Sequence, residues 1–375
     1  MPRKVMERKL CSLNQFHELL ALLQGGGYRL LGPMVRNEAI VYGDLQSAQD
    51  LPIGWMDEQG PGYYRLKRRT DGAYFGYNLG AHTWKQFLFP PKETLFTAKR
   101  QDNGLVVFQE GALPVEKMAF IGVRACEIKA MLIQDLAFNH KLAVYQQYVQ
   151  RRKSTFILAV NCTRSVSTCF CPSMDAGPKV EMGFDLSLTE VIGDDHYFLL
   201  EIGSERGRAM CDPLQLQDAQ EGHCEMANAL IERNREQMVR HVDAKGVHGM
   251  LTKSYSCKRW DEVARRCINC ANCTSVCPTC FCSDSADVLS LDGAQVERVQ
   301  TWDSCFNLSH SMMHGGPVRG SAQSRYRQWL THKFGTWWDQ FGVSGCVGCG
   351  RCITWCPVGI DVTEELHELQ KESPP

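Results

Sequence analysis

No apolar run in this 375-residue sequence is long enough to cross a membrane. The longest uninterrupted apolar stretches, such as Phe156 to Val160, have the length of a strand, whereas a membrane-spanning helix needs about 20 apolar residues. The formal net charge is only −1, which gives no electrostatic case for binding nucleic acid or an anionic membrane surface. No leader segment is expected, because Glu7, Arg8 and Lys9 interrupt the N-terminal region before any apolar run forms.

The sequence also lacks the common signatures of sites that make or break substrate bonds. It has no G-x-G-x-x-G after a predicted strand, no Walker motif, no G-x-S-x-G and no zincin helix. Gly345, Gly348 and Gly350 have the wrong order for a dinucleotide fingerprint and belong to a run of cysteines. We therefore expect no substrate-converting active site in this chain.

Cysteine, by contrast, is abundant, with 19 in the chain. Eight of them form two copies of the pattern C-x2-C-x2-C-x3-C-P, which is typical of bacterial iron–sulfur ligation. The first copy ends at Pro278 and the second at Pro357. The cysteines of the two runs are Cys267, Cys270, Cys273 and Cys277, then Cys346, Cys349, Cys352 and Cys356.

The spacing of each run suits a cubane cluster. Three thiolates, each separated from the next by two residues, can hold three corners of a cubane. In paired-cluster proteins the last cysteine of each run supplies the fourth corner of the neighbouring cluster. We therefore predict two adjacent [4Fe–4S] clusters. The first would be held by Cys267, Cys270, Cys273 and Cys356, and the second by Cys346, Cys349, Cys352 and Cys277.

Zinc is the main alternative for these cysteines, since C-x2-C pairs also build structural zinc sites. Such sites usually use two separated pairs, whereas each run here places four cysteines within eleven residues and is followed by proline. This favours iron–sulfur clusters over a zinc-bearing interaction module. A disulfide framework fits less well, because the number of cysteines is odd and the chain is long.

A further group of cysteines indicates a third site. Cys126 and Cys162 follow two predicted parallel strands, 118–123 and 156–160, at the edge where open α/β sheets place ligands. Together with Cys169 and Cys171 they would hold a third [4Fe–4S] cluster or a metal. The alternative is that all four are thiols buried as small hydrophobic residues. A bound flavin or substrate beside Cys126 and Cys162 would instead make the chain an enzyme.

Three more cysteines lie next to the runs. Cys280 competes with Cys277 for the ligand role, but only Cys277 has the spacing that the second run repeats. We therefore interpret Cys280, Cys282 and Cys305 as part of the packing around the clusters.

Periodicity predicts an α/β (α+β) N-terminal and middle region followed by a mostly helical, ferredoxin-like dicluster domain. An amphipathic helix is expected over 13–23, short strands over 28–108, and a strand–helix–strand unit with its helix over 126–148. A polar helix is expected over 217–242, and a helix over 321–334 lies in the 278–345 insert, which we expect to cover the metal sites. The predicted domains are 1–110 (mixed), 111–245 (α/β) and 246–375 (dicluster).

The sequence around the runs resembles a known family. The segment from Arg265 to Cys280, the Trp-Asp-Ser-Cys at 302–305 and the segment from Gly345 to Pro357 are similar to the beta subunit of cytoplasmic nickel–iron sulfhydrogenases. They are similar, too, to the electron-transfer subunit of anaerobic sulfite reductase. The segments around Cys126 and Cys171 also look like that family. The resemblance is strongest over 260–360 and weakest before residue 110.

The resemblance implies a cytoplasmic, non-catalytic subunit of an oxidoreductase complex. It implies that the chain relays electrons between a flavin subunit that uses NAD(P)H and a catalytic subunit. The catalytic partner would be a nickel–iron hydrogenase module or, as the alternative, a sirohaem sulfite reductase subunit. The eight cysteines of the runs carry over as cluster ligands.

Overall fold

The computed structural model describes residues 6–78, 80–111, 116–140 and 143–372. Its largest sheet has eight strands in the order β14-β1-β13-β12-β11-β8-β2-β3. The four strands β2, β8, β11 and β12 run parallel, and the strands outside them pair antiparallel. The bounds are Arg8–Ser12 (β1), Arg29–Arg36 (β2), Ala39–Asp44 (β3), Met118–Arg124 (β8), Phe156–Val160 (β11), Leu186–Ile192 (β12), His196–Ile202 (β13) and Gln217–Asp218 (β14).

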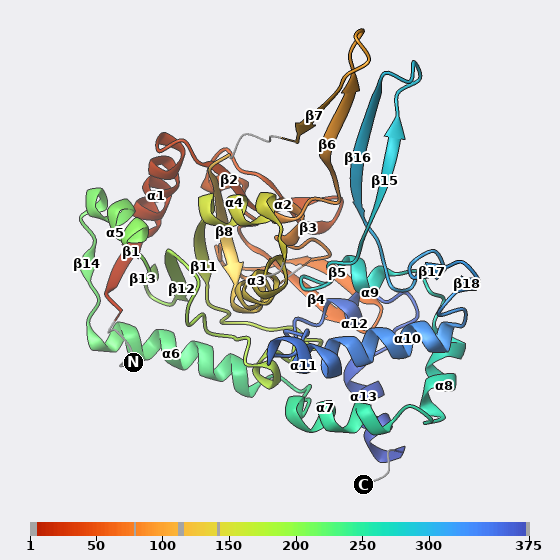
Figure 1. Cartoon of the computed structure of the whole chain (residues 1–375). Coiled ribbons are helices and arrows are strands. Elements are labelled where there is room, and N and C mark those ends of the chain that lie inside the picture. The colour runs from red at the N-terminus through yellow and green to blue at the C-terminus, as the bar shows by residue number, and fades with distance from the viewer. Residues whose placement is uncertain (1–5, 79, 112–115, 141–142, 373–375) are drawn as a thin grey trace.

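Helices cover both faces of this sheet (Figure 1). On one face, α1 (Leu13–Gly25) packs its buried leucines against alternate strand residues such as Ile121 and Leu158. On the other face, α3 (Ala125–Phe138) and α4 (Gln146–Ser154) cover Phe120 and Ile157. Because successive strand residues point to opposite faces, β8 and β11 are buried on both sides and read as continuous apolar runs. The expected α/β architecture is confirmed.

The predicted helix over 126–148 is wrong in its extent. The chain forms α3, then the short strands β9 (Asn139–His140) and β10 (Ala143–Val144), then α4. The Tyr145 amide donates to the Phe138 carbonyl at 2.8 Å, and the two rings pack together, which turns the chain back. The predicted polar helix over 217–242 is shorter as α6 (Glu221–Glu236), because 217–218 pair as strand β14.

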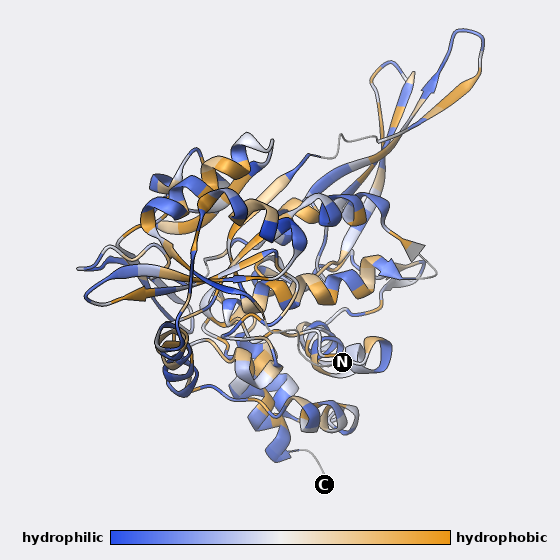
Figure 2. Cartoon of the chain, turned by 90° about the vertical axis from the view of Figure 1, so that its left-hand side faces the viewer, coloured by the Kyte–Doolittle hydropathy of each residue, from blue (hydrophilic) through white to orange (hydrophobic). Residues whose placement is uncertain are grey.

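Two long hairpins form a separate four-stranded sheet that projects from the body of the molecule (Figure 1). Its strands are β6 (Lys92–Arg100), β7 (Val106–Glu110), β15 (Ser283–Leu289) and β16 (Gln295–Trp302). The sequence predicts a helical cover over the 278–345 insert, yet its first part is the β15–β16 hairpin, which pairs with β6 instead. Figure 2 shows hydrophobic stretches along this arm. Its exposed apolar residues include Phe108 in β7 and Leu291 in the turn between β15 and β16.

Short helices dominate the C-terminal part. They are α7 (Ala244–Lys253), α8 (Arg259–Arg266), α9 (Asn272–Ser275), α10 (Ala322–Thr331), α11 (Trp337–Phe341), α12 (Arg351–Thr354) and α13 (Val362–Glu372). The strands β17 (Met312–Met313) and β18 (Gly316–Pro317) pair in the same part, before α10. The remaining elements, which precede it in the chain, are α2 (Lys85–Leu88), α5 (Glu205–Cys211), β4 (Trp55–Gly60) and β5 (Tyr63–Arg68). One hydrophobic core joins these helices to Cys126 and Phe170 of the middle region.

The described helices include none that is both long and apolar enough to cross a lipid bilayer. The division of the chain after residues 110 and 245 stays a prediction, and α7 begins at Ala244, just before the second boundary.

Candidate metal centres

The two cysteine runs fold into the same local structure. In the first run Asn269 and Ala271 have positive φ angles of 56° and 63°, and in the second run Gly348 and Gly350, at the matching positions, have 64° and 73°. Each run then enters a single helical turn, α9 or α12. Alternating left-handed residues aim successive backbone N–H groups into one concavity, a conformation found at many iron–sulfur sites.

Glycine is required in the second run by close packing. A Cβ atom on Gly348 would lie 2.5 Å from the Phe170 carbonyl oxygen, and one on Gly350 would lie 2.3 Å from the Thr168 oxygen. The Phe170 amide also donates to the Gly348 carbonyl at 2.8 Å. The loop that carries Cys169 and Cys171 therefore docks directly on the second run.

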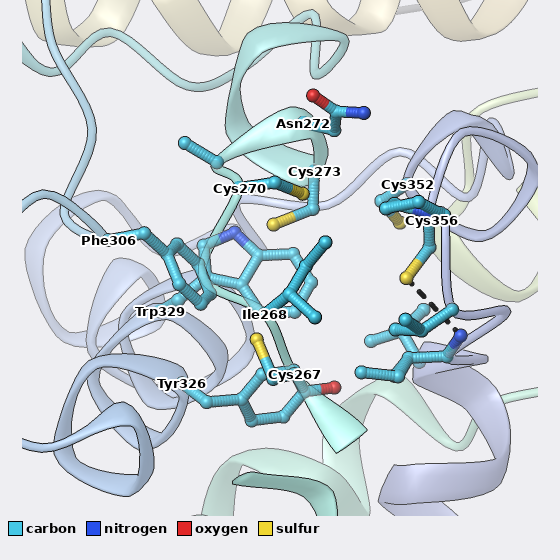
Figure 3. A pocket seen from close by; sticks show the side chains of 15 residues that line it. Cys267, Ile268, Cys270, Asn272, Cys273, Phe306, Tyr326, Trp329, Cys352 and Cys356 are labelled. Atoms are coloured by element: carbon cyan, nitrogen blue, oxygen red, sulfur yellow. Dashed lines mark hydrogen bonds between the residues drawn. The ribbon is translucent and has the colours of Figure 1, made fainter. Parts of the chain in front are cut away.

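Three cysteines of the first run and two of the second, Cys352 and Cys356, line one cavity (Figure 3). Cys267, Cys270 and Cys273 come from one loop, and Cys356 lies on the opposite wall. The Ile360 amide donates to the Cys356 sulfur at 3.3 Å. Most of the remaining lining is apolar and includes Phe306, Tyr326, Trp329, Ile268 and Val358. The lining includes the four cysteines that the sequence predicts for the first cluster, and soft sulfur donors in an apolar shell fit an iron–sulfur group.

The other four run cysteines form a second group. Cys277, the last cysteine of the first run, lies beside the start of the second run, because the Lys333 ammonium contacts both the Cys277 sulfur and the Gly345 carbonyl oxygen, one residue before Cys346. Hydrogen-bonding groups besides cysteine reach these sulfurs at short range. The Thr279 hydroxyl lies 3.1 Å and the Lys333 ammonium 3.2 Å from the Cys277 sulfur, and the Gly348 amide lies 3.4 Å from the Cys346 sulfur. The donor set again fits the predicted cluster.

Cys277 and Cys280 differ in their readiness to ionise. A hydrogen bond with Cys280 and the positive charge of Lys333 hold the pKa of Cys277 well below its usual range. The same hydrogen bond, together with burial, raises the pKa of Cys280. Since the thiolate is the form that binds metal, the Lys333 ammonium 3.2 Å from the Cys277 sulfur supports Cys277 as a ligand.

Burial acts on the other run cysteines. It raises the pKa of Cys346 to about 12 and that of Cys273 and Cys352 well above the usual value. Such thiols ionise when a bound metal supplies positive charge. Cys270 is exposed, so the first cavity reaches the protein surface.

The four cysteines predicted for a third site also come together. Cys126, Cys162, Cys169 and Cys171 line one small cavity, and Cys349 of the second run lines it too. The Arg124 guanidinium lies 3.9 Å from the Cys162 sulfur and donates to two backbone carbonyls. Four thiols and a buried cation in one cavity fit a third cluster as a donor set.

Other functional features had weaker sequence signals. Cys282 and Cys305 are hydrogen-bonded to each other, which lowers the pKa of Cys282 to about 6. Arg351, in the second run, pairs with Glu127 where both side chains are 1% exposed. Lys333 has no sequence signal, because nothing distinguishes it from a surface lysine. Among the described residues, no group of three or more His, Cys, Asp and Glu is arranged to hold a single metal ion.

Comparisons with known proteins agree with the sequence and the fold. Residues 266–360 match the model of the 4Fe-4S dicluster domain. The chain is also similar to sulfhydrogenase 2 subunit beta of Pyrococcus furiosus, with 28% identity over 291 residues, which covers 76% of this chain and 82% of the relative. The predicted resemblance is therefore confirmed.

Proposed function

The chain carries a 4Fe-4S dicluster domain and is related to a sulfhydrogenase beta subunit, and on this premise we propose that it relays electrons inside an oxidoreductase complex. The observation that carries the proposal is the crossed pairing of the runs: Cys356 faces the first run and Cys277 lies beside the start of the second. When bound, [4Fe–4S] clusters accept and release single electrons. The chain's own residues hold them, exclude water and set their surroundings.

The second run supplies cysteines to both of the other sites. The first cavity reaches the surface at Cys270. Cys352 lines that first cavity while belonging to the second set of cysteines, and Cys349 of the second set lines the third cavity. The second run thus links all three sites, and the exposure of Cys270 supports electron entry or exit there.

The partners are the finer part of the proposal. We infer a flavin subunit that uses NAD(P)H on one side and a nickel–iron hydrogenase module on the other, in a reducing cytoplasm. The relative's name, a sulfhydrogenase subunit, supports hydrogenase over sulfite reductase. Anaerobic co-purification from the native cell tests this choice. A nickel-containing partner is the expected result, and a sirohaem partner would contradict it.

The central test replaces one ligand. Cys270→Ser is expected to remove or convert one cluster and to stop electron transfer through the chain, while the partner subunits keep their own chemistry. Cys224→Ser, a change of a cysteine outside the three sites, is the matched control and should leave the iron content unchanged. Equal iron content and equal electron transfer in both variants would refute the role of Cys270.

The third site has its own test. We propose that Cys126, Cys162, Cys169 and Cys171 hold a third [4Fe–4S] cluster, since they share one cavity beside Arg124. Cys171→Ser should then lower the iron content by about four atoms per chain. Cys211→Ser changes a buried cysteine in the hydrophobic core beneath α1 and should leave the iron content unchanged. No loss of iron in Cys171→Ser would mean that the four thiols are packing residues.

A further inference from the structure

Lys333 is a buried lysine at the second group of run cysteines. Its side chain is 6% exposed. The ammonium lies 3.2 Å from the Cys277 sulfur, 2.9 Å from the Thr279 hydroxyl and 3.0 Å from the Gly345 carbonyl oxygen. These three contacts use all three of its N–H donors.

An irregular helical turn places this side chain. Residues His332–Thr336 form a π-helix between α10 and α11, a conformation that often marks functional sites. The Lys333 carbonyl accepts hydrogen bonds from the Gly345 amide at 2.8 Å and from the Ser344 hydroxyl at 3.3 Å. Both the backbone and the side chain of Lys333 are therefore fixed to the segment that leads into Cys346.

No carboxylate balances this charge. Within the part of the chain that the structure describes, no Asp or Glu forms an ion pair with Lys333, whereas the neighbouring Arg351 is paired with Glu127. An ammonium group buried without a counter-charge is strongly disfavoured. Its electrostatic partners are instead the sulfurs of Cys277, Cys280 and Cys346.

A second buried lysine lies near the same segment of the chain. The Lys85 ammonium donates to the Cys280 carbonyl oxygen at 2.9 Å and lies 3.9 Å from the centre of the Trp302 ring. It does not touch a run cysteine's sulfur. Burial lowers the pKa of Lys85, so Lys333 is the lysine whose charge acts directly on a run sulfur.

We propose that Lys333 sets the reduction potential of the cluster that Cys277, Cys346, Cys349 and Cys352 hold. The proposal rests on the proposed function. Reduction adds one negative charge to a cluster, and burial opposes that charge. A fixed ammonium beside a ligand sulfur favours the reduced form and so raises the potential. In the first cavity, by contrast, the donor at Cys356 is a neutral backbone amide.

The test is a redox titration of each cluster by electron paramagnetic resonance on the full, anaerobically purified chain. Lys333→Met is expected to make the second cluster harder to reduce. At a given potential its ratio of reduced to oxidised cluster should fall at least tenfold, which corresponds to a midpoint lower by about 59 mV for one electron. The first cluster should keep its midpoint. Lys333→Arg keeps the charge, so the midpoint of the second cluster should stay close to its wild-type value. Lys371→Met, an exposed lysine on α13, is the matched control and should change neither midpoint.

Each outcome decides the proposal. Unchanged midpoints in Lys333→Met, or equal shifts in both clusters, would overturn it. If Lys333→Met fails to assemble the second cluster, Lys333→Gln, which keeps a hydrogen-bond donor without the charge, must show the same downward shift or the proposal is wrong. A wild-type chain without iron and sulfide would instead refute the proposed function, so the two failures are distinguishable.

Discussion

Cys277 and Cys280 lie three residues apart and share one hydrogen bond, yet the surroundings give them opposite tendencies. The Cys280 thiol and the positive charge of Lys333 lower the pKa of Cys277, while the pKa of Cys280 is raised. The spacing of the runs predicts Cys277 as the ligand from the sequence. The structure adds a physical reason for the same choice, because the Lys333 ammonium lies 3.2 Å from the Cys277 sulfur and the thiolate is the ligand form.

The two cysteines should therefore respond differently to substitution. Cys277→Ser is expected to lose about four iron atoms per chain, the content of one cubane, whereas Cys280→Ser keeps them. Iron and acid-labile sulfide analysis after anaerobic purification measures the difference. The opposite pattern would mean that Cys280 takes the fourth corner.

Arg351 shows a second effect at the scale of the residue. Its guanidinium is buried against Glu127 and donates to the Gly80 and His82 carbonyl oxygens, at 3.0 Å each. Cys352, next to it in the sequence, belongs to the second group. Arg351 thus ties the second run to α3 and to the loop before α2.

Breaking this pair should be costly. Arg351→Met leaves the Glu127 carboxylate buried without its counter-charge, with the Trp84 amide still donating to it at 3.2 Å, and we expect the free energy of unfolding to fall by about 3–5 kcal/mol. Combining it with Glu127→Gln should recover much of that loss. Anaerobic urea unfolding measures both. As a comparison, Lys371→Met removes an exposed pair with Glu368 and should cost no more than about 1 kcal/mol. Equal losses for the single and double variants would contradict the account.

At the scale of elements, the two run loops are the best-predicted part of the site. Their duplication in the sequence reappears as left-handed residues at matching positions, Asn269 with Gly348 and Ala271 with Gly350. The sequence could not show that the second loop packs on residues 168–171, since that contact joins segments about 180 residues apart in the chain. Only this contact explains why the second run has glycine at both positions, since a Cβ atom there would clash with residues 168–171.

A pair of glycine substitutions tests the contact. Gly348→Ala must push its Cβ against the Phe170 carbonyl, so we expect it to disturb the loop of Cys169 and Cys171 and to lower the iron content. Gly342→Ala has a similar positive φ of 68° but open space around it. It should cost only about 1 kcal/mol of backbone strain and keep the iron. Equal iron loss in both variants would show that strain, and not loop contact, is responsible.

Other elements escaped prediction for the same reason. The helix α1 follows from local spacing and was predicted. The arm of β6, β7, β15 and β16 pairs segments nearly 200 residues apart in the sequence, and no local pattern reveals such pairing. The break between α3 and α4 depends on the packing of Phe138 against Tyr145, which periodicity does not register.

At the scale of the whole molecule, the middle region and the C-terminal part share one hydrophobic core. This core includes Cys126 and Phe170 from the middle region together with Trp260 and Trp329 from the C-terminal part. The second run lies at their junction, where Cys349 lines the same cavity as Cys126. This continuity supports a single line of redox sites from the surface at Cys270 into the interior.

The most direct test of this account is iron and sulfide analysis with electron paramagnetic resonance of the anaerobically purified chain. At least about eight iron atoms and eight sulfides per chain are expected, with signals on reduction that show two clusters close enough to interact magnetically. Colourless protein that contains zinc, with no acid-labile sulfide and no signal on reduction, would contradict the central claim.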